Sequence, residues 1–212
     1  MLPWDFFKGG SMKLYIIRHG ETVWNQQLRI QGDSDVELTD RGRWMAAQTG
    51  QGLKGVHFDA IYSSPLIRSY ETATIIRGDR TLPIVKDMRL REMGFGVLEG
   101  KSFNDEESGA AKLFDDFYHD PVAYQPPKNG ESFVSLCQRA DNFMQDIVAK
   151  YTGDEHVMIV AHQGMNTALL RYIKGLPLEK FWSGELLRFC AVCVAQHKNG
   201  AFEMLQENTI YY

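Results

Sequence analysis

Cysteine is scarce in this chain of 212 residues, which has only Cys137, Cys190 and Cys193. Few cysteines in an odd number argue against a disulfide framework and are typical of a reducing, cytoplasmic environment. Cys190-Ala-Val-Cys193 has the spacing of a redox or zinc motif, but the pair lies in an apolar, strand-like run and no second pair accompanies it. We therefore favour buried core thiols over a metal or redox site.

Long apolar runs and net positive charge are also absent. No stretch approaches the roughly 18 consecutive apolar residues that a membrane helix requires, and Asp5, Lys8 and glycines interrupt the first residues too often for a signal peptide. The formal net charge of -4 argues against general binding of nucleic acid or of an anionic membrane, which needs a basic face. Any basic pocket is therefore local, which suits a small anionic substrate.

Composition predicts one folded domain. With 44% hydrophobic residues, a chain of this length can bury a full core. Met12 stands directly before the first strand pattern, so we expect residues 1–11 to be a leader segment and residues 12–212 to form the domain. Our hypothesis is that the aromatic side chains of the leader dock on the body of the protein or on a neighbouring molecule. They are Trp4, Phe6 and Phe7.

The first informative stretch is a short strand that ends in charged residues. Leu14 to Ile17 is a continuous apolar run, typical of a strand buried on both faces, and Arg18-His19-Gly20 follows it. Open α/β sheets bind ligands beyond the carboxyl ends of their parallel strands. An arginine there offers a fork of donors to an oxyanion, and a histidine offers a ring nitrogen. The pattern indicates an anion site with a nucleophile or base, although a strand end with surface charges fits it equally well.

A second arginine is expected at the same edge of the sheet. Ser63-Ser64-Pro65 ends a second short strand, expected over 58–62, and Ser64 and Pro65 are typical of a helix start. Arg68 is then expected near the positive end of that helix, where a cation is unfavourable unless an anion lies beside it. This position favours anion binding over a solvated arginine.

Glu92 lies in a glycine-punctuated loop after a third expected strand over 82–86. A carboxylate near two arginines is usually their salt-bridge partner. Beside a bound phosphate it can instead hold a proton and donate it, because like charge disfavours ionisation. The residues alone leave both interpretations open.

A second histidine repeats the layout of the first. Val157 to Ala161 is the clearest pattern of a buried strand in the chain, and His162-Gln163-Gly164 follows it. The helix expected to begin there adds free N–H donors suited to phosphate. Two such histidines on separate strands are much harder to dismiss than one.

Periodicity and turn residues predict the remaining elements. Apolar residues at helical spacing from Glu131 to Tyr151 predict an amphipathic helix. Residues 101–130 are polar, aromatic and proline-bearing, so we expect an insertion, with one helix near 103–118, that covers the site. The other expectations are a long loop up to Glu37, helices over 38–52 and 163–174, and strands over 187–196 and 201–206 joined at 198–200.

Four motifs together carry a resemblance. In chain order they are Arg18-His19-Gly20-Glu21-Thr22 with Asn25, Ser63-Ser64-Pro65-Leu66-Ile67-Arg68-Ser69-Tyr70-Glu71-Thr72-Ala73, Leu90-Arg91-Glu92-Met93-Gly94-Phe95-Gly96, and His162-Gln163-Gly164. The chain resembles the histidine phosphatase superfamily, in its phosphoglycerate-mutase-like branch, from residue 13 to about 170. The resemblance implies an α/β fold of three layers, α/β/α, with a mixed, mainly parallel sheet, to which residues 101–130 add a helical and loop cap.

The resemblance also implies roles. His19 would attack phosphorus and form a phosphohistidine, and the cationic neighbours Arg18 and Arg68 would favour the neutral form that this requires. Glu92 would protonate the leaving alcohol and then activate water. The groups that would hold the phosphoryl oxygens are Arg18, Asn25, Arg68, His162 and the backbone N–H of Gln163. Residues at positions that line the pocket in relatives are Thr22, Gln31 and Gly32. No metal or organic cofactor is implied.

Departures from the mutase pattern favour a phosphatase. Where phosphoglycerate mutases of this branch continue the glutamate motif with arginine, histidine and tyrosine, this chain has Met93-Gly94-Phe95. Residues 101–130 also lack the arginine pair that those enzymes carry in the cap, and their charge is mainly acidic. The acids are Asp105, Glu106, Glu107, Asp115, Asp116 and Asp120. We therefore expect a phosphomonoester hydrolase that acts on a small phosphorylated metabolite.

Three alternatives are kept. The main one is a cofactor-dependent phosphoglycerate mutase. A catalytically silent module that binds phosphate or phosphoproteins is disfavoured because all the residues expected to carry out the catalytic chemistry are present. A metal hydrolase that uses His19, Glu92 and His162 is disfavoured because the flanking arginines would repel a cation. The sequence leaves the physiological substrate and the oligomeric state open.

Overall fold

The computed structural model describes residues 10–105, 107 and 109–212. The expectation for Trp4, Phe6 and Phe7 therefore lies outside the described residues. Strand β1 (Ser11–Arg18) begins with the last residue of the expected leader segment. Ser11 pairs with Lys198, and its amide donates a hydrogen bond of 2.8 Å to Asp154 Oδ1, so this residue belongs to the sheet.

One sheet of six strands, in the order β3-β2-β4-β1-β5-β6, forms the centre of the protein. Its other strands are β2 (Ala60–Ser63), β3 (Ile84–Lys86), β4 (His156–Ala161), β5 (Val192–Lys198) and β6 (Ala201–Thr209). The pairs β1/β4, β2/β4 and β2/β3 are parallel, whereas β1/β5 and β5/β6 are antiparallel. The expectation of a mixed, mainly parallel sheet is confirmed.

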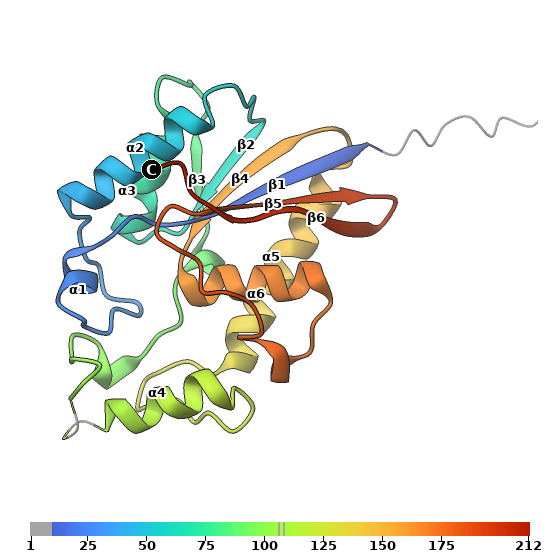
Figure 1. The fold of residues 1–212 in the computed structure, drawn as a ribbon. Helices are drawn as coiled ribbons and strands as arrows, with labels where there is room; N and C mark the ends of the chain where they lie inside the picture. Colours follow the sequence, from blue (N-terminus) through green and yellow to red (C-terminus); the bar gives the residue numbers. More distant parts are fainter. Residues whose placement is uncertain (1–9, 106, 108) are drawn as a thin grey trace, which may run out of the picture.

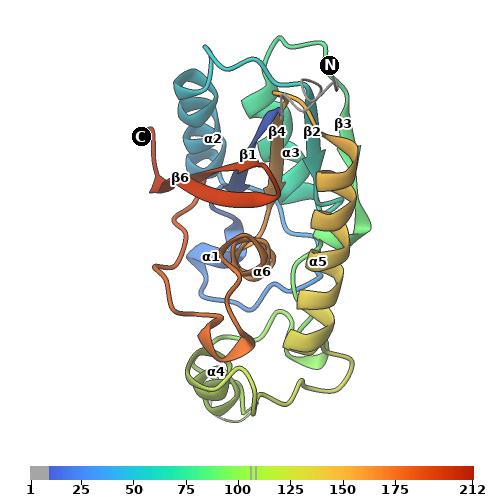
Figure 2. The same cartoon turned by 90° about the vertical axis from the view of Figure 1, so that its right-hand side faces the viewer.

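Helices cover both faces of this sheet (Figure 1). Two lie on one face and two on the other, as the turned view in Figure 2 also shows. The first pair is α2 (Asp40–Gly52) and α3 (Ile67–Arg77), and the second is α5 (Phe133–Lys150) and α6 (Gln163–Lys174). The short helices are α1 (Val23–Gln26), α4 (Ala110–His119), η1 (Met88–Leu90), η2 (Gly96–Leu98) and η3 (Leu178–Lys180).

The central strand β1 separates two hydrophobic cores. Its side chains alternate between the faces, so Leu14 and Ile16 join the core with α5 and α6, whereas Tyr15 and Ile17 join the core with α2 and α3. This double burial explains why β1 is a continuous apolar run rather than an alternating one. The three-layer α/β/α arrangement is thereby established.

The register of β1 and β4 places the two histidines at one edge of the sheet. Arg18 pairs with Ala161 across the parallel ladder, so His19 and His162 leave neighbouring strands at the same level. The end of β2 lies beside them, because Ser63 pairs with Val160.

Helix α4 lies apart from the sheet, at the lower end of the molecule in Figures 1 and 2. It is amphipathic: Ala110, Phe114 and Phe117 are buried, and Lys112 and Asp116 are exposed. The expected helix near 103–118 is therefore present, but it begins seven residues later, because residues 101–105 form turns that pair with the loop after α1.

The fifth strand also differs from its prediction. It begins at Val192 rather than Leu187, and the preceding residues turn around the end of β1. Cys190 has φ of 52°, and its N–H donates to Arg18 O at 3.0 Å. These contacts satisfy the backbone of an apolar run that local pattern alone assigns to a strand.

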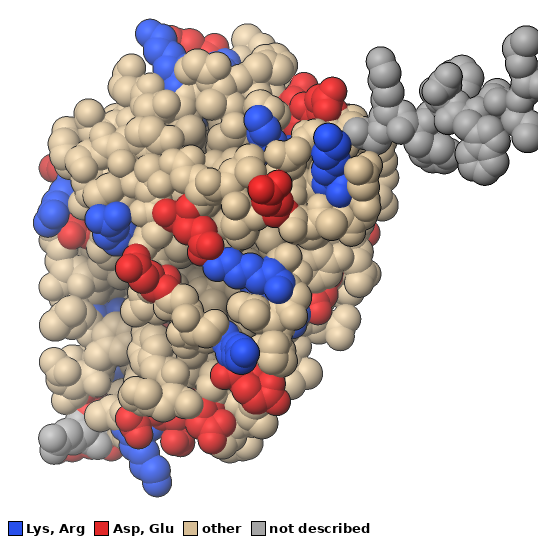
Figure 3. Space-filling model, turned by 45° about the vertical axis from the view of Figure 1, so that its right-hand side comes forward, with Lys and Arg blue, Asp and Glu red and all other residues tan. Residues whose placement is uncertain are grey.

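The surface carries mixed charges. In Figure 3 lysine and arginine side chains lie among acidic ones, and acidic side chains gather at the lower end, the level of α4 in Figure 1. Asp115, Asp116 and Asp120 are exposed there. Within the described residues, no helix is both long and apolar enough to cross a membrane.

Candidate active site

His19 lies directly after β1 and is only 3% exposed. Its Nδ1 is 2.7 Å from the carbonyl oxygen of Gly20. Because a carbonyl only accepts, Nδ1 carries the proton and Nε2 has the free lone pair. Burial, together with the positive charges of Arg68 and Arg18, lowers the pKa of His19 well below its ordinary value. The ring is therefore neutral, with Nε2 available as a nucleophile.

Gly20 fixes the strand end against helix α2. A Cβ at this position would lie 2.6 Å from the carbonyl oxygen of Gly42, so no larger residue fits without a shift. The Gly20 N–H donates to Thr72 Oγ1 at 3.1 Å. The small residue thus permits close packing of two backbones, which holds His19 between α2 and α3.

Arg68 is fully buried near the start of α3, and its positive charge helps to lower the pKa of His19. Its two terminal nitrogens donate to Ser34 O and Gly32 O, both at 2.7 Å. Desolvation lowers its pKa to about 10, so the guanidinium remains charged at neutral pH. Its Nε has no hydrogen-bond partner among the described residues and is a buried donor in need of an acceptor.

Arg18 is held from the opposite side by the turn before β5. Its Nη1 donates to the carbonyl oxygen of Leu187, and its guanidinium carbon lies 4.3 Å from the centroid of the Phe189 ring. Tyr212 Oη donates to Phe189 O at 2.8 Å, which fixes this turn. Burial lowers the pKa of Arg18 below its ordinary value, and the Glu92 carboxylate opposes part of this shift.

His162 faces His19, with 5.1 Å between the ring centroids. Its Nε2 lies 2.7 Å from Ser64 Oγ, and Ser69 Oγ lies 3.3 Å from the same nitrogen. Burial and the charge of Arg68 lower the pKa of His162 well below its ordinary value. Ser64 is not the N-cap of α3, which is Leu66; its hydroxyl accepts from the Leu66 N–H at 3.3 Å and contacts His162.

Glu92 joins the site through the first turn of α6. Its Oε1 accepts from Met93 N at 2.9 Å and from Met165 N at 3.2 Å, and its Oε2 accepts from Gly164 N at 3.1 Å. Gly164 allows this approach, since a Cβ there would lie 2.8 Å from Oε1. The free donors of the helix N-terminus thus hold a carboxylate beside the histidines.

The loop after β1 supplies the remaining predicted residues. Asn25, Gln31 and Gly32 line the cavity, whereas Thr22 is fully buried behind it. The Thr22 N–H donates to Asn25 Oδ1 at 3.0 Å, and its hydroxyl lies 2.8 Å from Gln31 Oε1. Thr22 therefore orients two lining residues rather than facing the cavity.

These groups meet in one cavity of about 110 Å³. All of the predicted site residues except Thr22 and His162 line it, and these two are fully buried. Polar and charged residues form one end, and aromatic rings form the other. The aromatic lining consists of Phe95, Phe103, Phe114, Phe117, Tyr118 and Trp182.

Several residues that support the site were not expected from the sequence. Arg139 of α5 donates to the carbonyl oxygens of Arg91 and Glu92 and pairs with Glu131, which fixes the Glu92 loop. Glu99 accepts from Asp33 N at 3.0 Å and from Phe95 N at 2.9 Å. Arg139 reaches the Glu92 loop from 47 or more residues away, and Glu99 reaches Asp33 across 66 residues, so no local signal identifies these roles.

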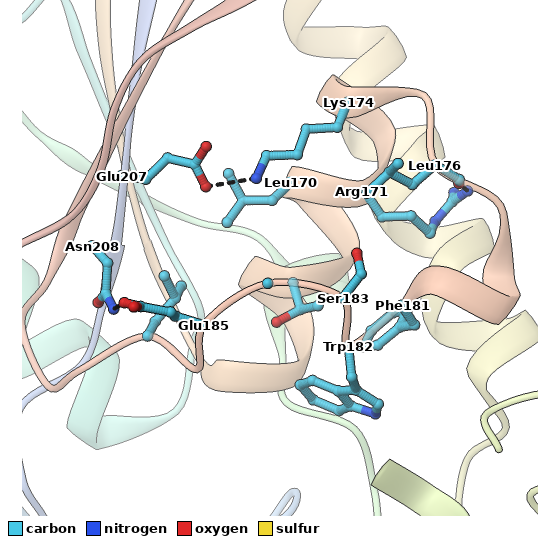
Figure 4. Close-up of a pocket in the computed structure, with 13 residues that line it drawn as sticks. Leu170, Arg171, Lys174, Leu176, Phe181, Trp182, Ser183, Glu185, Glu207 and Asn208 are labelled. Carbon is cyan, nitrogen blue, oxygen red and sulfur yellow. Dashed lines mark hydrogen bonds and ion pairs between the residues drawn. The ribbon is translucent and has the colours of Figure 1, made fainter. Parts of the chain in front are cut away.

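A second cavity, of about 220 Å³, lies along the later turns of α6 (Figure 4). Lys174 pairs with Glu207 across it, and Asn208 Nδ2 donates to Glu185 Oε2 at 3.2 Å. Trp182 lines this cavity as well as the first, with its indole turned away from the Lys174–Glu207 pair. Each charged group of the second cavity thus has a partner, since Arg171 pairs with Asp141 outside the lining.

The cysteines are placed as expected for core residues. Cys190 and Cys193 are buried, and burial raises the pKa of Cys190 to about 12. In the part of the chain that the structure describes, no cluster of three or more histidine, cysteine or acidic side chains is arranged to hold a metal ion.

The structure is a three-layer α/β protein that brings two facing histidines to one edge of its sheet. The chain matches the histidine phosphatase superfamily (branch 1) over residues 14–210 and belongs to it. Phosphoserine phosphatase 1 of Hydrogenobacter thermophilus is 33% identical over 174 residues, which are 81% of each chain. Adenosylcobalamin/alpha-ribazole phosphatase of Escherichia coli is 32% identical over 171 residues, 81% of this chain and 83% of that one. The solved structure of Bacillus stearothermophilus YhfR has a TM-score of 0.88 and 38% identity, over 94% of this chain and 98% of that chain.

Proposed function

We propose that the protein is a metal-independent phosphatase that hydrolyses small phosphomonoesters through a phosphohistidine at His19. One observation carries the proposal. A neutral, buried histidine presents a free Nε2 beside two arginines, the buried Arg68 and the half-buried Arg18, and faces a second neutral histidine. This combines a nucleophile with fixed positive charge for the phosphoryl oxygens, which is what phosphoryl transfer requires.

In the first step His19 Nε2 attacks phosphorus. A P–N bond forms as the ester P–O bond breaks, and the leaving oxygen takes the proton of the Glu92 carboxyl. The ring becomes positively charged, and Gly20 O stabilises it by accepting from Nδ1–H. Arg18 and Arg68 neutralise the phosphoryl oxygens, while Asn25, His162 and the Gln163 N–H complete their cradle.

In the second step water hydrolyses the phosphohistidine. The Glu92 carboxylate accepts a proton from water, the new P–O bond forms, and the electron pair of the P–N bond returns to Nε2. The proton taken from water restores the Glu92 carboxyl that the next cycle needs. The α6 N–H groups keep the carboxyl in place through both steps.

The composition of the cap supports hydrolysis over phosphoglycerate isomerisation. A mutase must retain a polyanionic bisphosphorylated intermediate, which requires additional cations. Lys112 on α4 is exposed, and the side chains that α4 contributes to the cavity are Phe114, Phe117 and Tyr118. Arg29 is the only arginine of the lining beyond the phosphate end, and it is exposed.

The test is phosphate release from a panel of phosphomonoesters in the presence of a chelator, with 3-phosphoglycerate assayed for both hydrolysis and isomerisation. We expect hydrolysis of several esters, abolished in His19→Ala and retained in the matched control His57→Ala, whose side chain is 87% exposed. Isomerisation without phosphate release would instead establish a mutase. A lack of turnover on every ester would favour a silent binding module.

A further inference from the structure

The catalytic cavity has two chemically different ends. The end at the histidines holds Arg18, Arg68 and Glu92. The opposite end, which receives the leaving group of a bound ester, is lined by aromatic rings together with Ile30 and Met93. We call this opposite end the aromatic chamber and define it by the six rings of Phe95, Phe103, Phe114, Phe117, Tyr118 and Trp182.

The rings of the chamber form a connected cluster. Phe114 lies 4.7 Å from Phe103 and 5.2 Å from Phe95, measured between ring centroids, and Trp182 lies 5.2 Å from both Phe117 and Tyr118. Trp182 Nε1 also donates to Phe117 O at 2.7 Å. The chamber is therefore built in advance of any ligand, so an apolar group enters it without an ordering cost.

Among the described residues of the lining, one ionised side chain is present besides Arg18, Arg68 and Glu92, that of Arg29. The charged residues of α4, such as Lys112, Asp115 and Asp116, are exposed on its outer face and do not line the cavity. Arg29 lines the cavity but is exposed, where water screens its charge. A carboxylate or ammonium on the leaving group would therefore be desolvated against rings without a buried counter-ion, which is costly.

We propose that the preferred substrates are phosphomonoesters of uncharged, apolar alcohols or phenols about the size of one aromatic ring, selected by the aromatic chamber. This inference rests on the proposed phosphatase function and names its substrate class. It contrasts with phosphoserine, whose leaving group carries both an ammonium and a carboxylate.

Tyr118 is the ring best suited to test the proposal. It is 38% exposed, more than any other ring of the chamber, so its side chain is not required for the core. It lines the same cavity as Arg18 and Glu92, so it is part of the wall that a bound ester meets. Truncation of Tyr118 therefore removes part of the wall of the aromatic chamber and leaves its buried rings in place.

The experiment compares kcat/KM for benzyl phosphate and O-phosphoserine, both esters of primary alcohols. We expect benzyl phosphate to be preferred by about 10- to 100-fold, the range given by burial of one benzene ring. Tyr118→Ala should lower kcat/KM for benzyl phosphate by about 3- to 10-fold and leave phosphoserine changed by less than about twofold. The matched control is Val122→Ala, 55% exposed on the same cap and outside the cavity lining, which should change neither ester.

Binding provides a readout independent of chemistry. The phosphonate 2-phenylethylphosphonate should inhibit hydrolysis of p-nitrophenyl phosphate more strongly than 2-amino-4-phosphonobutyrate, by the same 10- to 100-fold range. A preference for phosphoserine, lost in Arg29→Gln, would overturn the proposal and assign selection to Arg29. Turnover of both esters without preference would also overturn it. Absence of His19-dependent turnover of p-nitrophenyl phosphate would instead refute the phosphatase function.

Discussion

Replacement of Glu92 by glutamine tests the proton-transfer role of this residue. The glutamine keeps the size of the side chain but cannot donate the carboxyl proton to a leaving oxygen. General acid catalysis is worth about 10²- to 10⁴-fold for poor leaving groups. We therefore expect kcat/KM for benzyl phosphate to fall by that factor, whereas p-nitrophenyl phosphate, whose phenolate leaves without a proton, should lose less than about tenfold.

The structure also predicts a stability cost for this variant. Glu92 accepts three backbone N–H groups with its two oxygens, and glutamine offers only one oxygen. At least one N–H then faces an amide N–H, so we expect a loss of about 1–3 kcal/mol in the free energy of unfolding, measured by urea denaturation. The loss affects both substrates equally and cannot create a difference between them.

The assay must isolate the first step. The parameter kcat/KM reports the steps up to release of the alcohol, so it excludes the later activation of water. Glu99→Gln is the matched control, because Glu99 also accepts backbone N–H groups beside the site but does not line the cavity. It should lower both esters by the same factor. Equal losses for both esters in Glu92→Gln would refute the acid role.

Two further predictions concern pH and phosphate binding. The pKa values of His19 and His162 are depressed in the folded protein, so the unfolded chain takes up two more protons than the folded one as the pH falls below about 6.5. The free energy of unfolding should therefore drop by up to about 3 kcal/mol per pH unit from these two groups. Urea midpoints that stay constant or rise on acidification would contradict this. Phe189→Leu removes the ring stacked on Arg18 and should weaken inhibition by inorganic phosphate about 3- to 30-fold, with kcat less affected. Phe189→Tyr keeps a ring and should retain the inhibition of the unchanged protein. Equal inhibition of both variants would remove Phe189 from a positioning role.

The proposed nucleophile and the histidine that faces it were accessible from the sequence, because each stands at the end of a strong local pattern. Arg18 and His19 end one buried apolar run, and His162 ends another. The expectation that the ends of parallel strands share an edge then brought the histidines together without any structural information. The neutral form of His19 was implied by the family resemblance, and the burial of both rings appears only in the structure.

The supporting contacts could not be predicted, because they join residues far apart in the chain. Ser64 is a reasonable helix cap by sequence, yet its hydroxyl lies against His162, 98 residues away. The turn before β5 has the apolar composition of a strand, but hydrogen bonds to the end of β1 and the positive φ of Cys190 override it. Tertiary contacts decided both cases over local propensity.

The aromatic chamber shows the same limit. The aromatic residues of the segment 101–130 were expected to cover the site, but Trp182 and Phe95 complete the chamber from elsewhere in the chain. Only the folded structure brings these rings together and turns the acids of α4 outward. Substrate preference is therefore a property of the tertiary arrangement.

The central claim is the phosphohistidine at His19, and rapid acid-free quenching of turnover with a phosphorus-labelled monoester tests it most directly. We predict one base-stable, acid-labile phosphoryl group on the peptide that contains His19. His19→Ala should carry no such group and should lose several orders of magnitude of activity. Label on another residue, or near-normal turnover by His19→Ala, would contradict the account.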